Sequence, residues 1–554
     1  MLVGTRYGRA QIDPKYDAIV VGSGLGGLTT AALLAKAGRR VLVLERHYTA
    51  GGFTHSYRRR GFEWDVGVHY VGDVHNEASP MRRLFDTVTD GQLQWAKMDD
   101  VYDRVIVGED SYDFVAGAAN FRDSLLQSFP TAGAEIDEYL RLIRSATRSL
   151  PLHFGPRYLP GPLQPLAELA ASVPSRHYFT RTTASVLADV ISDPKLAGVL
   201  TAQWGDYGLP PGQSSFGMHA IVAQHYLGGG NYPVGGAWQI ANTITPVIEA
   251  AGGKVVVDAE VSELLMHGDR AIGVRMANGD EIQADKVISA VGVQNTFGQL
   301  VPPDVAARLP VAQQAQSLRP AVSHIGLFIG LNGTTEDLGL EQTNLWLYRD
   351  YDHDRSLQRY LAQPNTDFPL NYISFPSAKD PSWPQRFPGK STIDVISLAP
   401  YEWFERWQRT PWRNRGAEYE DFKATLSEAL LADVYRHAPG VQGRIAYHEL
   451  STPLSTQEFS GYQRGQVYGL EHSPERFRQS WLRARTAVPG LYLTGQDILF
   501  CGVGSALMSG AVTAATVLGP AAARMLPDVL GVSPVRALPG GLGRSRQPAP
   551  SQAA

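Results

Sequence analysis

The feature that most constrains this chain is a glycine fingerprint between an apolar strand and a helix near its start. Residues 16–21 read YDAIVV, an apolar run typical of a buried strand. Three glycines spaced as G-x-G-x-x-G follow at the start of an alanine-rich helix: Gly22, Gly24 and Gly27. The first permits a tight turn, the second lets the backbone approach a pyrophosphate, and the third allows close helix–strand packing. The pattern predicts a dinucleotide site with phosphates at the helix N-terminus.

Two further features refine the nature of this dinucleotide. Glu45 ends the next apolar strand, where an acid accepts hydrogen bonds from ribose hydroxyls and disfavours a 2′-phosphate. NAD or FAD is therefore favoured over NADP. A glycine pair, Gly51 and Gly52, follows soon after the acid and lets the chain fold back under the diphosphate. That pair favours FAD.

A second glycine-rich segment lies near the other end of the chain. A strand ends at Gly495, Asp497 follows, and Gly502 and Gly504 open an apolar helix. Free N–H groups at a helix start favour an anionic ligand, such as the flavin ring or its ribityl chain. Asp497 would accept a hydrogen bond from a ribityl hydroxyl. The two segments predict one FAD site in two parts, with other structure inserted between them.

Composition and charge exclude several kinds of partner. The net charge is -4 and no basic stripe is present, so we expect no nucleic-acid partner. Cys501 is the one cysteine, which excludes a disulfide within the chain and fits a reducing compartment. The start lacks the apolar core of a signal peptide, and no apolar run is long enough to span a bilayer. We therefore expect a cytoplasmic or peripheral membrane protein, without a metal site.

The front and end motifs together resemble the phytoene desaturase, carotenoid isomerase and retinol saturase superfamily of flavoproteins. Three segments are most similar to the retinol saturase branch: residues 51–72, 451–477 and 493–511. The pair His69-Tyr70 and the run TGQD carry the similarity to that branch. The resemblance keeps the order of parts along most of the chain and is weakest in residues 115–230 and 335–440.

This resemblance implies an α/β fold with a Rossmann-type FAD-binding domain of the glutathione-reductase-like, amine-oxidase type and an inserted α+β substrate domain. It implies that FAD contacts thirteen positions: Gly22, Gly24, Gly27, Glu45, Arg46, Gly51, Gly52, Gly235, Gly236, Val261, Gly495, Asp497 and Gly504. Val261 would contribute backbone contacts, and the glycine pair at 235–236 would run beside the flavin. Phe53 stands where related amine oxidases have an arginine, which makes amine oxidation a less expected activity.

The expected domains follow from this order of parts. We assign residues 16–115, 231–300 and 486–530 to a discontinuous FAD-binding domain. Residues 116–230 and 301–485 form the expected substrate-binding domain. Its proline-rich stretch at 151–200 carries aromatic and arginine side chains and is a candidate for peripheral membrane contact, or for a plain helical cap. The tail at 534–554, rich in Pro, Gly, Ser and Ala, is predicted to be disordered.

The chemistry implied by the resemblance is redox chemistry on a carbon–carbon double bond of an apolar polyene or lipid. Reduction needs a hydride from FAD and a proton from an acid or water in a dry pocket. Four side chains are candidate proton donors: His69, Tyr70, His225 and Tyr232. No second glycine fingerprint follows a strand, so the electron donor or acceptor would be a partner, a transient nicotinamide or the substrate itself.

Three functions remain open from the sequence. The first is an ene-reductase of the retinol saturase type. The second is a carotenoid desaturase or a redox-neutral cis–trans isomerase, which would share the fold and differ in electron flow. The third is a non-catalytic prenyl-lipid carrier of the GDP-dissociation-inhibitor type, which the intact glycine fingerprint, Glu45 and Asp497 disfavour.

Overall fold

Two large sheets, each built from segments distant in sequence, organise the chain. The computed structural model describes residues 1–158 and 177–524. The first sheet has eight strands: β1 (Thr5–Arg6), β2 (Lys15–Val21), β3 (Val41–Leu44), β10 (Lys254–Val257), β11 (Val261–His267), β12 (Arg270–Met276), β13 (Glu281–Ser289) and β19 (Leu491–Leu493). Their order is β1-β10-β3-β2-β13-β12-β11, with β19 beside β13. Neighbouring strands from β1 to β13 in this order are parallel, and so are β13 and β19. β12 is antiparallel to both of its neighbours, β13 and β11.

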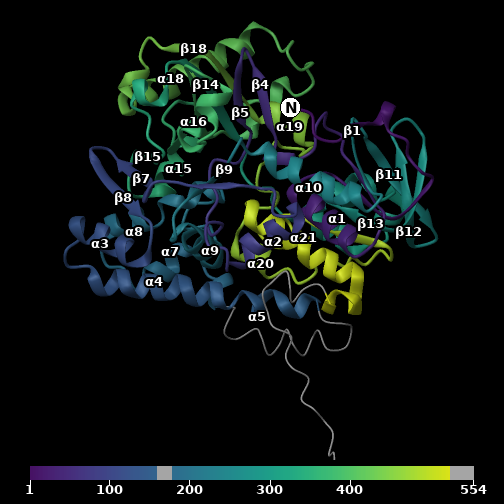
Figure 1. Cartoon of the computed structure of the whole chain (residues 1–554). Coiled ribbons are helices and arrows are strands. Elements are labelled where there is room, and N and C mark those ends of the chain that lie inside the picture. The colour runs from purple at the N-terminus through teal and green to yellow at the C-terminus, as the bar shows by residue number, and fades with distance from the viewer. Residues whose placement is uncertain (159–176, 525–554) are drawn as a thin grey trace, which may run out of the picture.

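The second sheet lies at the upper left of Figure 1, and the first lies to the right. Its strands are β7 (Val101–Val107), β8 (Asp110–Val115), β14 (His324–Asn332), β15 (Asn344–Tyr348), β16 (Leu370–Ser374), β17 (Lys390–Leu398) and β18 (Ile445–Ser451). Two further sheets have two antiparallel strands each: β4 (Ser56–Arg59) with β5 (Phe62–Asp65), and β6 (Trp95–Lys97) with β9 (Asn231–Pro233).

Helices form two groups around these sheets. One group packs in the core of the first sheet: α1 (Leu25–Lys36), α2 (Pro80–Thr89), α10 (Trp238–Ala250) and α21 (Val503–Leu518). A second, at the lower left of Figure 1, belongs to the core of the second sheet: α3 (Ala118–Ser128), α4 (Gly133–Arg148), α7 (Thr183–Leu187), α8 (Pro194–Leu200) and α9 (Phe216–Tyr226).

The remaining helices are mostly short and lie in the connections. They are α5 (Leu150–Phe154), α11 (Val293–Asn295), α12 (Pro303–Ala306), α13 (Pro310–Ser317), α14 (Thr335–Leu338), α15 (His353–Leu361), α16 (Pro376–Lys379), α17 (Trp383–Arg386), α18 (Ala417–His437), α19 (Pro453–Ser460) and α20 (Pro474–Phe477).

The apolar runs of the sequence explain why the first sheet forms. A parallel strand is covered on both faces and so needs a continuous apolar run rather than alternation. β3 reads VLVL and all four of its residues are buried. Every residue of α1 from Leu25 to Ala35 is also buried, because the helix packs between the sheet and its neighbours α10 and α21. The predicted α/β class with a Rossmann-type unit is thereby confirmed.

One expected boundary differs from the structure. Residues 101–115 were placed with the cofactor-binding part, but β7 and β8 pair with β15 at the edge of the second sheet. A strand pair at that position depends on side-chain packing across the sheet, which no local motif marks. The predicted tail at 534–554 and residues 159–176 of the stretch at 151–200 lie outside the described residues.

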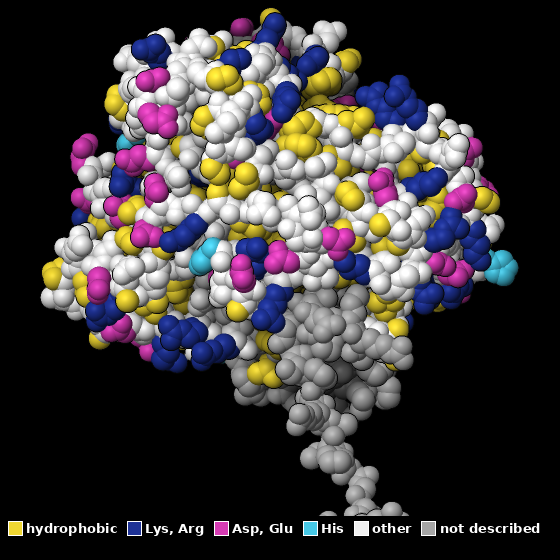
Figure 2. Space-filling model, viewed as in Figure 1, with side chains coloured by type: hydrophobic (Ala, Val, Ile, Leu, Met, Phe, Trp, Pro, Cys, Tyr) yellow, Lys and Arg dark blue, Asp and Glu magenta, His cyan; other side chains and the backbone are white. Residues whose placement is uncertain are grey.

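One described helix has the length and composition of a membrane span, which differs from the prediction that no apolar run is long enough. It covers Val503–Ala522 with a mean hydropathy of 1.3. Its buried side chains, among them Leu507, Ala511 and Ala514, belong to the core beside the first sheet. Length and composition alone are shared with core helices and assign no membrane role. On the face shown in Figure 2, charges of both signs are interspersed.

Buried histidines make the fold sensitive to acid. Burial lowers the pKa of His219 to about 3 from 6.5. Its ring nitrogens contact the hydroxyls of Tyr139 and Tyr207 at 3.0 and 3.2 Å. Burial also lowers the pKa of six further histidines: His55, His69, His153, His225, His324 and His353. Between the two pKa values the unfolded chain binds protons that the folded chain does not, so stability falls as the pH drops through this window.

We expect His219→Gln to reduce the acid-side loss of stability by about 1.4 kcal/mol per pH unit, because one fewer buried group is protonated on unfolding. The measurement is the free energy of unfolding in urea at several pH values below about 6.5. His267→Gln is the matched control, since His267 is exposed on β11. Equal slopes for the His219 variant and the unmodified protein would contradict this account.

Candidate active site

The front glycines form a tight turn between β2 and α1. A Cβ added to Gly27 would lie 2.3 Å from the carbonyl oxygen of Gly22, so only glycine fits there. A Cβ added to Gly24 would meet no atom within 4 Å, because this residue faces the cavity described below. Gly24 is also the N-cap of α1 and makes no side-chain cap bond. The turn therefore presents free backbone N–H groups to an anion.

Glu45 follows β3 and fastens this turn. Its Oε2 accepts hydrogen bonds from the backbone N and Oγ of Ser23 at 2.8 and 2.7 Å, and its Oε1 accepts one from the backbone N of His47 at 2.8 Å. The carboxylate also lines the cavity. Because an ionised carboxylate has about four acceptor positions, one remains for a ribose hydroxyl.

The glycine pair packs directly against the front turn. Gly51 and Gly52 have φ of 124° and 56°, a region that favours glycine. A Cβ on Gly52 would lie 2.9 Å from the Cα of Gly24. Arg46 and Val261 line the same cavity, and Arg46 donates to the carbonyl oxygen of Glu458 at 2.7 Å. These positions therefore meet at one site, as the sequence predicted.

The segment at the end of the chain completes this site. A Cβ on Gly26 in α1 would lie 2.8 Å from the Cα of Gly495, so the two glycine-rich segments touch. Gly495 and Gly504 line the cavity. Gly502 caps α21 without a side-chain bond, which leaves a second helix N-terminus open toward the cavity.

Asp497 has a different position from the one expected. Its Oδ2 accepts a hydrogen bond from the backbone N of Val293 at 2.8 Å, and its Oδ1 accepts one from Leu470 at 3.0 Å. The residue is buried and is not among the residues that line the cavity. The carboxylate holds two loops together, and the expected contact with a ribityl hydroxyl stays a prediction.

The second glycine pair also lies outside the cavity lining. Gly235 donates to Asp380 Oδ1 at 3.1 Å, and a Cβ on Gly236 would lie 3.1 Å from Glu63 Oε1. Tyr232 is buried nearby, and its hydroxyl donates to the Asp65 carboxyl. The structure therefore places these three predicted residues in a polar cluster beside the site, not at the cavity surface.

One cavity of about 1470 Å³ connects the glycine turns to the second sheet. Pockets for a single drug-sized ligand measure roughly 300–1,000 Å³, so this cavity has room for a dinucleotide and a second molecule. Its far end is lined largely by aliphatic and aromatic side chains from α9 and three strands: Met218, Ile221, Val222, Trp346, Tyr372 and Leu398. The cavity is polar at the glycine end and apolar at the far end.

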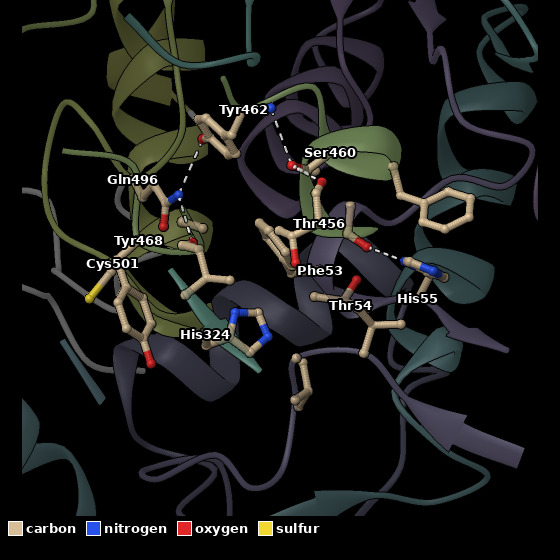
Figure 3. Close-up of a pocket in the computed structure, with 18 of the residues that line it drawn as sticks. Phe53, Thr54, His55, His324, Thr456, Ser460, Tyr462, Tyr468, Gln496 and Cys501 are labelled. Atoms are coloured by element: carbon tan, nitrogen blue, oxygen red, sulfur yellow. Dashed lines mark hydrogen bonds between the residues drawn. The ribbon is translucent and has the colours of Figure 1, made fainter. Parts of the chain in front are cut away.

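Figure 3 shows the middle of this cavity. Phe53 and His55 lie on one side and Gln496 and Cys501 on the other, with His324 between them in this view. Gln496 Nε2 donates to the hydroxyl of Tyr462 and to a backbone carbonyl, both at 3.2 Å. The Phe53 ring stacks with Tyr462 at 6.5 Å between centroids. Aromatic rings therefore line this part of the cavity.

His69 lines the cavity as a neutral ring. Its Nδ1 lies 3.5 Å from Asp394 Oδ2, beyond a good hydrogen bond, and its carbonyl accepts one from Lys379 at 3.1 Å. Burial, and then the nearby Lys379 charge, lower the pKa of His69 to about 3. A ring with that pKa is neutral at neutral pH and is a poor proton donor.

Tyr70 and His225 also line the cavity, and both are already engaged. The Tyr70 hydroxyl donates to Asp103 Oδ2 at 2.9 Å, and its ring stacks on Tyr226 at 4.0 Å. His225 Nε2 accepts from the backbone N of Gly72 at 2.8 Å, and burial lowers its pKa to about 4. Three of the four predicted proton donors thus come together, whereas Tyr232 does not.

Sequence reasoning missed Asp206. This carboxyl lines the cavity, and its Oδ2 is buried without a hydrogen-bond partner. It lies in the segment where the family resemblance is weakest. The one local signal was an acid within the aromatic run QWGDY, which is an unusual place for an unpaired charge.

Comparison with known proteins agrees with this geometry. The profile of a family described as flavin containing amine oxidoreductase matches residues 25–518. The chain belongs to this family. Among solved structures, putrescine oxidase bound to putrescine resembles this member of the family with a TM-score of 0.60 at 17% identity, covering 91% of this chain and 99% of that one. That likeness concerns the fold.

Curated relatives lie closer in sequence to this family member. An all-trans-retinol 13,14-reductase from Danio rerio is 37% identical over 528 residues, which is 92% of this chain and 87% of that protein. An inactive all-trans-retinol 13,14-reductase from the same species is 33% identical over 539 residues, 92% and 87% of the two chains. Prolycopene isomerase 1 from an Oncidium hybrid cultivar is 24% identical over 525 residues, 90% and 83%.

Family membership and the glycine cradle agree on the cofactor. The cofactor is FAD, and the chain is an FAD-dependent oxidoreductase. The cradle fits this group because its backbone leaves open space at Gly24 and aims two helix N-termini at the cavity. The predicted superfamily, fold class and cofactor are confirmed.

Proposed function

We propose that this chain reduces a carbon–carbon double bond of an apolar polyene and is a reductase of the all-trans-retinol 13,14-reductase type. The observation that carries the proposal is the single cavity that joins the glycine cradle to an apolar, aromatic chamber. A polyene fits such a chamber by hydrophobic burial and ring contacts. The 37% identity to a retinol reductase and the 24% identity to a prolycopene isomerase support this substrate class.

The cofactor contacts are part of the proposal. We assign the front turn to the pyrophosphate, Glu45 to a ribose, and the start of α21 to the flavin end. The positions that line the cavity support this assignment: Gly22, Gly24, Gly27, Glu45, Arg46, Gly51, Gly52, Val261, Gly495 and Gly504. We leave Asp497, Gly235 and Gly236 out of the set of direct contacts, because they do not line the cavity.

The protein has two tasks in such a reduction. When bound, FAD supplies the two electrons as a hydride. The side chains of the chamber exclude water, which protects the hydride and strengthens electrostatic interactions there. Residues at the chamber must also deliver one proton to the second carbon.

The test uses the holoenzyme with all-trans-retinol as the probe. The flavin is reduced without oxygen, the retinoid is added, and flavin absorbance and product mass are followed. We expect the flavin to be reoxidised and the product to gain two hydrogens. A product of unchanged mass would support the isomerase alternative, whereas reduction of oxidised flavin with a product lacking two hydrogens would support a desaturase. Protein that binds retinoid but no FAD would support a carrier.

Two expectations about partners remain proposals. We propose that electrons reach the flavin from a separate protein or a transient nicotinamide. We also propose a peripheral membrane contact, which would deliver an apolar substrate; the exposed Leu152 in α5, with 49% of its surface accessible, supports it. Flotation with phospholipid vesicles tests this contact, and absence of vesicle binding would contradict it.

A further inference from the structure

Asp206 is a carboxyl in the wall of the cavity that the reaction scheme above leaves without a role. It ends a short 3-10 helix at Ala202–Asp206, between the buried rings of Trp204 and Tyr207. One carboxyl oxygen is buried with no hydrogen-bond partner. An ionised carboxylate in that state would be strongly destabilised, whereas a protonated one is tolerated.

A second buried carboxyl, that of Asp103, interacts with Asp206 and is better suited to carry a negative charge. Asp103 on β7 is buried and accepts three hydrogen bonds: from Asn344 at 2.9 Å, Gln203 at 2.8 Å and Tyr70 at 2.9 Å. Three donors favour the ionised form of a carboxyl. The Tyr70 hydroxyl also interacts with Asp206, so it links the two acids.

The pair therefore divides its protons unequally. Burial raises the pKa of both carboxyls, but the three donors and the nearby Lys379 oppose this effect at Asp103. At Asp206, burial and the charge of Asp103 act together and hold the pKa well above its ordinary value of 3.8. Like charges at close range do not both ionise, so Asp206 keeps its proton at neutral pH.

The position of Asp206 joins the two ends of the cavity. The Cys501 thiol donates to the backbone oxygen of Asp206 at 3.5 Å. Cys501 immediately precedes Gly502, the N-cap of α21, at the end of the site assigned to the flavin. The Asp206 carboxyl also lies near enough to three tyrosines that line the chamber to help raise their pKa values: Tyr226, Tyr372 and Tyr468.

Four other groups that line the cavity are poorer proton donors. His69 and His225 are neutral, with pKa values of about 3 and 4. The Tyr70 proton is engaged by Asp103. Burial raises the pKa of the Cys501 thiol, and its proton points to a backbone carbonyl. Asp206 is the remaining acid among these groups, and its Oδ2 has no hydrogen-bond partner.

We propose that Asp206 is the catalytic acid that protonates the substrate carbon in the reduction proposed above. The inference rests on that proposed function. The hydride and its electron pair form a C–H bond at one carbon. In the same step, the π electron pair of the double bond forms a C–H bond with the Asp206 proton at the neighbouring carbon, and Asp206 is left as a carboxylate that regains a proton from water.

The test compares Asp206→Asn with the unmodified holoenzyme in anaerobic single turnovers with all-trans-retinol. Asparagine keeps the shape and removes the acid, so we expect the rate of flavin reoxidation to fall about 100-fold or more. The affinity for the retinoid should change little. Asp354→Asn is the matched control, because Asp354 accepts a backbone hydrogen bond from Gly212 at 2.8 Å and does not line the cavity.

A second readout does not depend on turnover. The infrared spectrum of the substrate-free protein at neutral pH should contain a carboxylic-acid C=O band that Asp206→Asn removes and Asp354→Asn keeps. If Asp206→Asn both removes this band and lowers the rate of flavin reoxidation, the proposal is supported. A wild-type rate in the Asp206 variant, or no change in the band, overturns it. If the unmodified protein forms no saturated product but shows the band, the proposed function fails while the protonated state of Asp206 stands.

Discussion

Gly24→Asp should give a protein that folds normally and has lost its flavin. The backbone of Gly24, with φ of -58° and ψ of 163°, accepts any residue, and an added Cβ meets no atom within 4 Å. Aspartate is moreover a favourable N-cap for α1. Its carboxylate would occupy the space of the pyrophosphate and repel it, so the change acts on the ligand and not on the fold.

We expect the affinity for FAD to fall by about 100-fold, equivalent to about 2.7 kcal/mol. The measurement is a titration of apoprotein with FAD, followed by quenching of flavin fluorescence, alongside the melting temperature of the apoprotein. Gly8→Asp is the control, because Gly8 is exposed and also has open space around its Cβ position. Unchanged FAD affinity in the Gly24 variant would refute the assignment of this turn to the pyrophosphate.

Lys379→Met should destabilise the folded protein by about 3–5 kcal/mol, the usual cost of removing one partner from a buried charged network. Lys379 in α16 is buried, and its Nζ donates to the carbonyl of His69, to Asn344 and to Ser374 at 2.7 Å. Its positive charge also stabilises the ionised form of the buried Asp103 carboxyl. Methionine fills the space but leaves these groups uncompensated.

The pH dependence gives a second signature of this lysine. Burial lowers the pKa of Lys379 to about 7 from 10.5. Between these values the unfolded chain binds a proton that the folded chain has released, so Lys379 makes stability rise with pH across that window. Urea unfolding at several pH values should show this rise in the unmodified protein and its absence in Lys379→Met. Lys97→Met, at a half-exposed lysine, is the control and should leave both the stability and its pH dependence unchanged. Equal effects of the Lys379 and Lys97 variants would contradict the stabilising role of Lys379.

The parts of the site that could be predicted are those where the backbone dictates the residue. Gly27 and Gly52 were predictable because a side chain at either position would collide with a neighbouring turn. Glu45 was predictable because a strand end and a helix start fix its place. The strands of the first sheet followed for a similar reason, since burial on both faces demands apolar runs such as VLVL.

The parts that could not be predicted depend on long-range side-chain contacts. Asp497 follows a cofactor motif, yet its partners are amides of Val293 and Leu470 from distant loops. The position of Tyr232 likewise depends on a distant partner, because Asp65 lies 167 residues away in the sequence. Asp206 gained significance only from its distance to Cys501 and its link to Asp103, and no spacing in the sequence encodes either one.

The late position of β19 and α21 sets the order in which the protein can mature. A ribosome delivers the front glycine turn first and these two elements near the end, and they supply the wall at Gly495 and the second helix N-terminus. Until synthesis passes residue 518, the first sheet lacks its β19 neighbour and α1 lacks the helix that covers it. The complete cofactor site therefore forms only after residue 518 has been synthesised, and until then the nascent chain must remain competent for it with an apolar face of α1 uncovered.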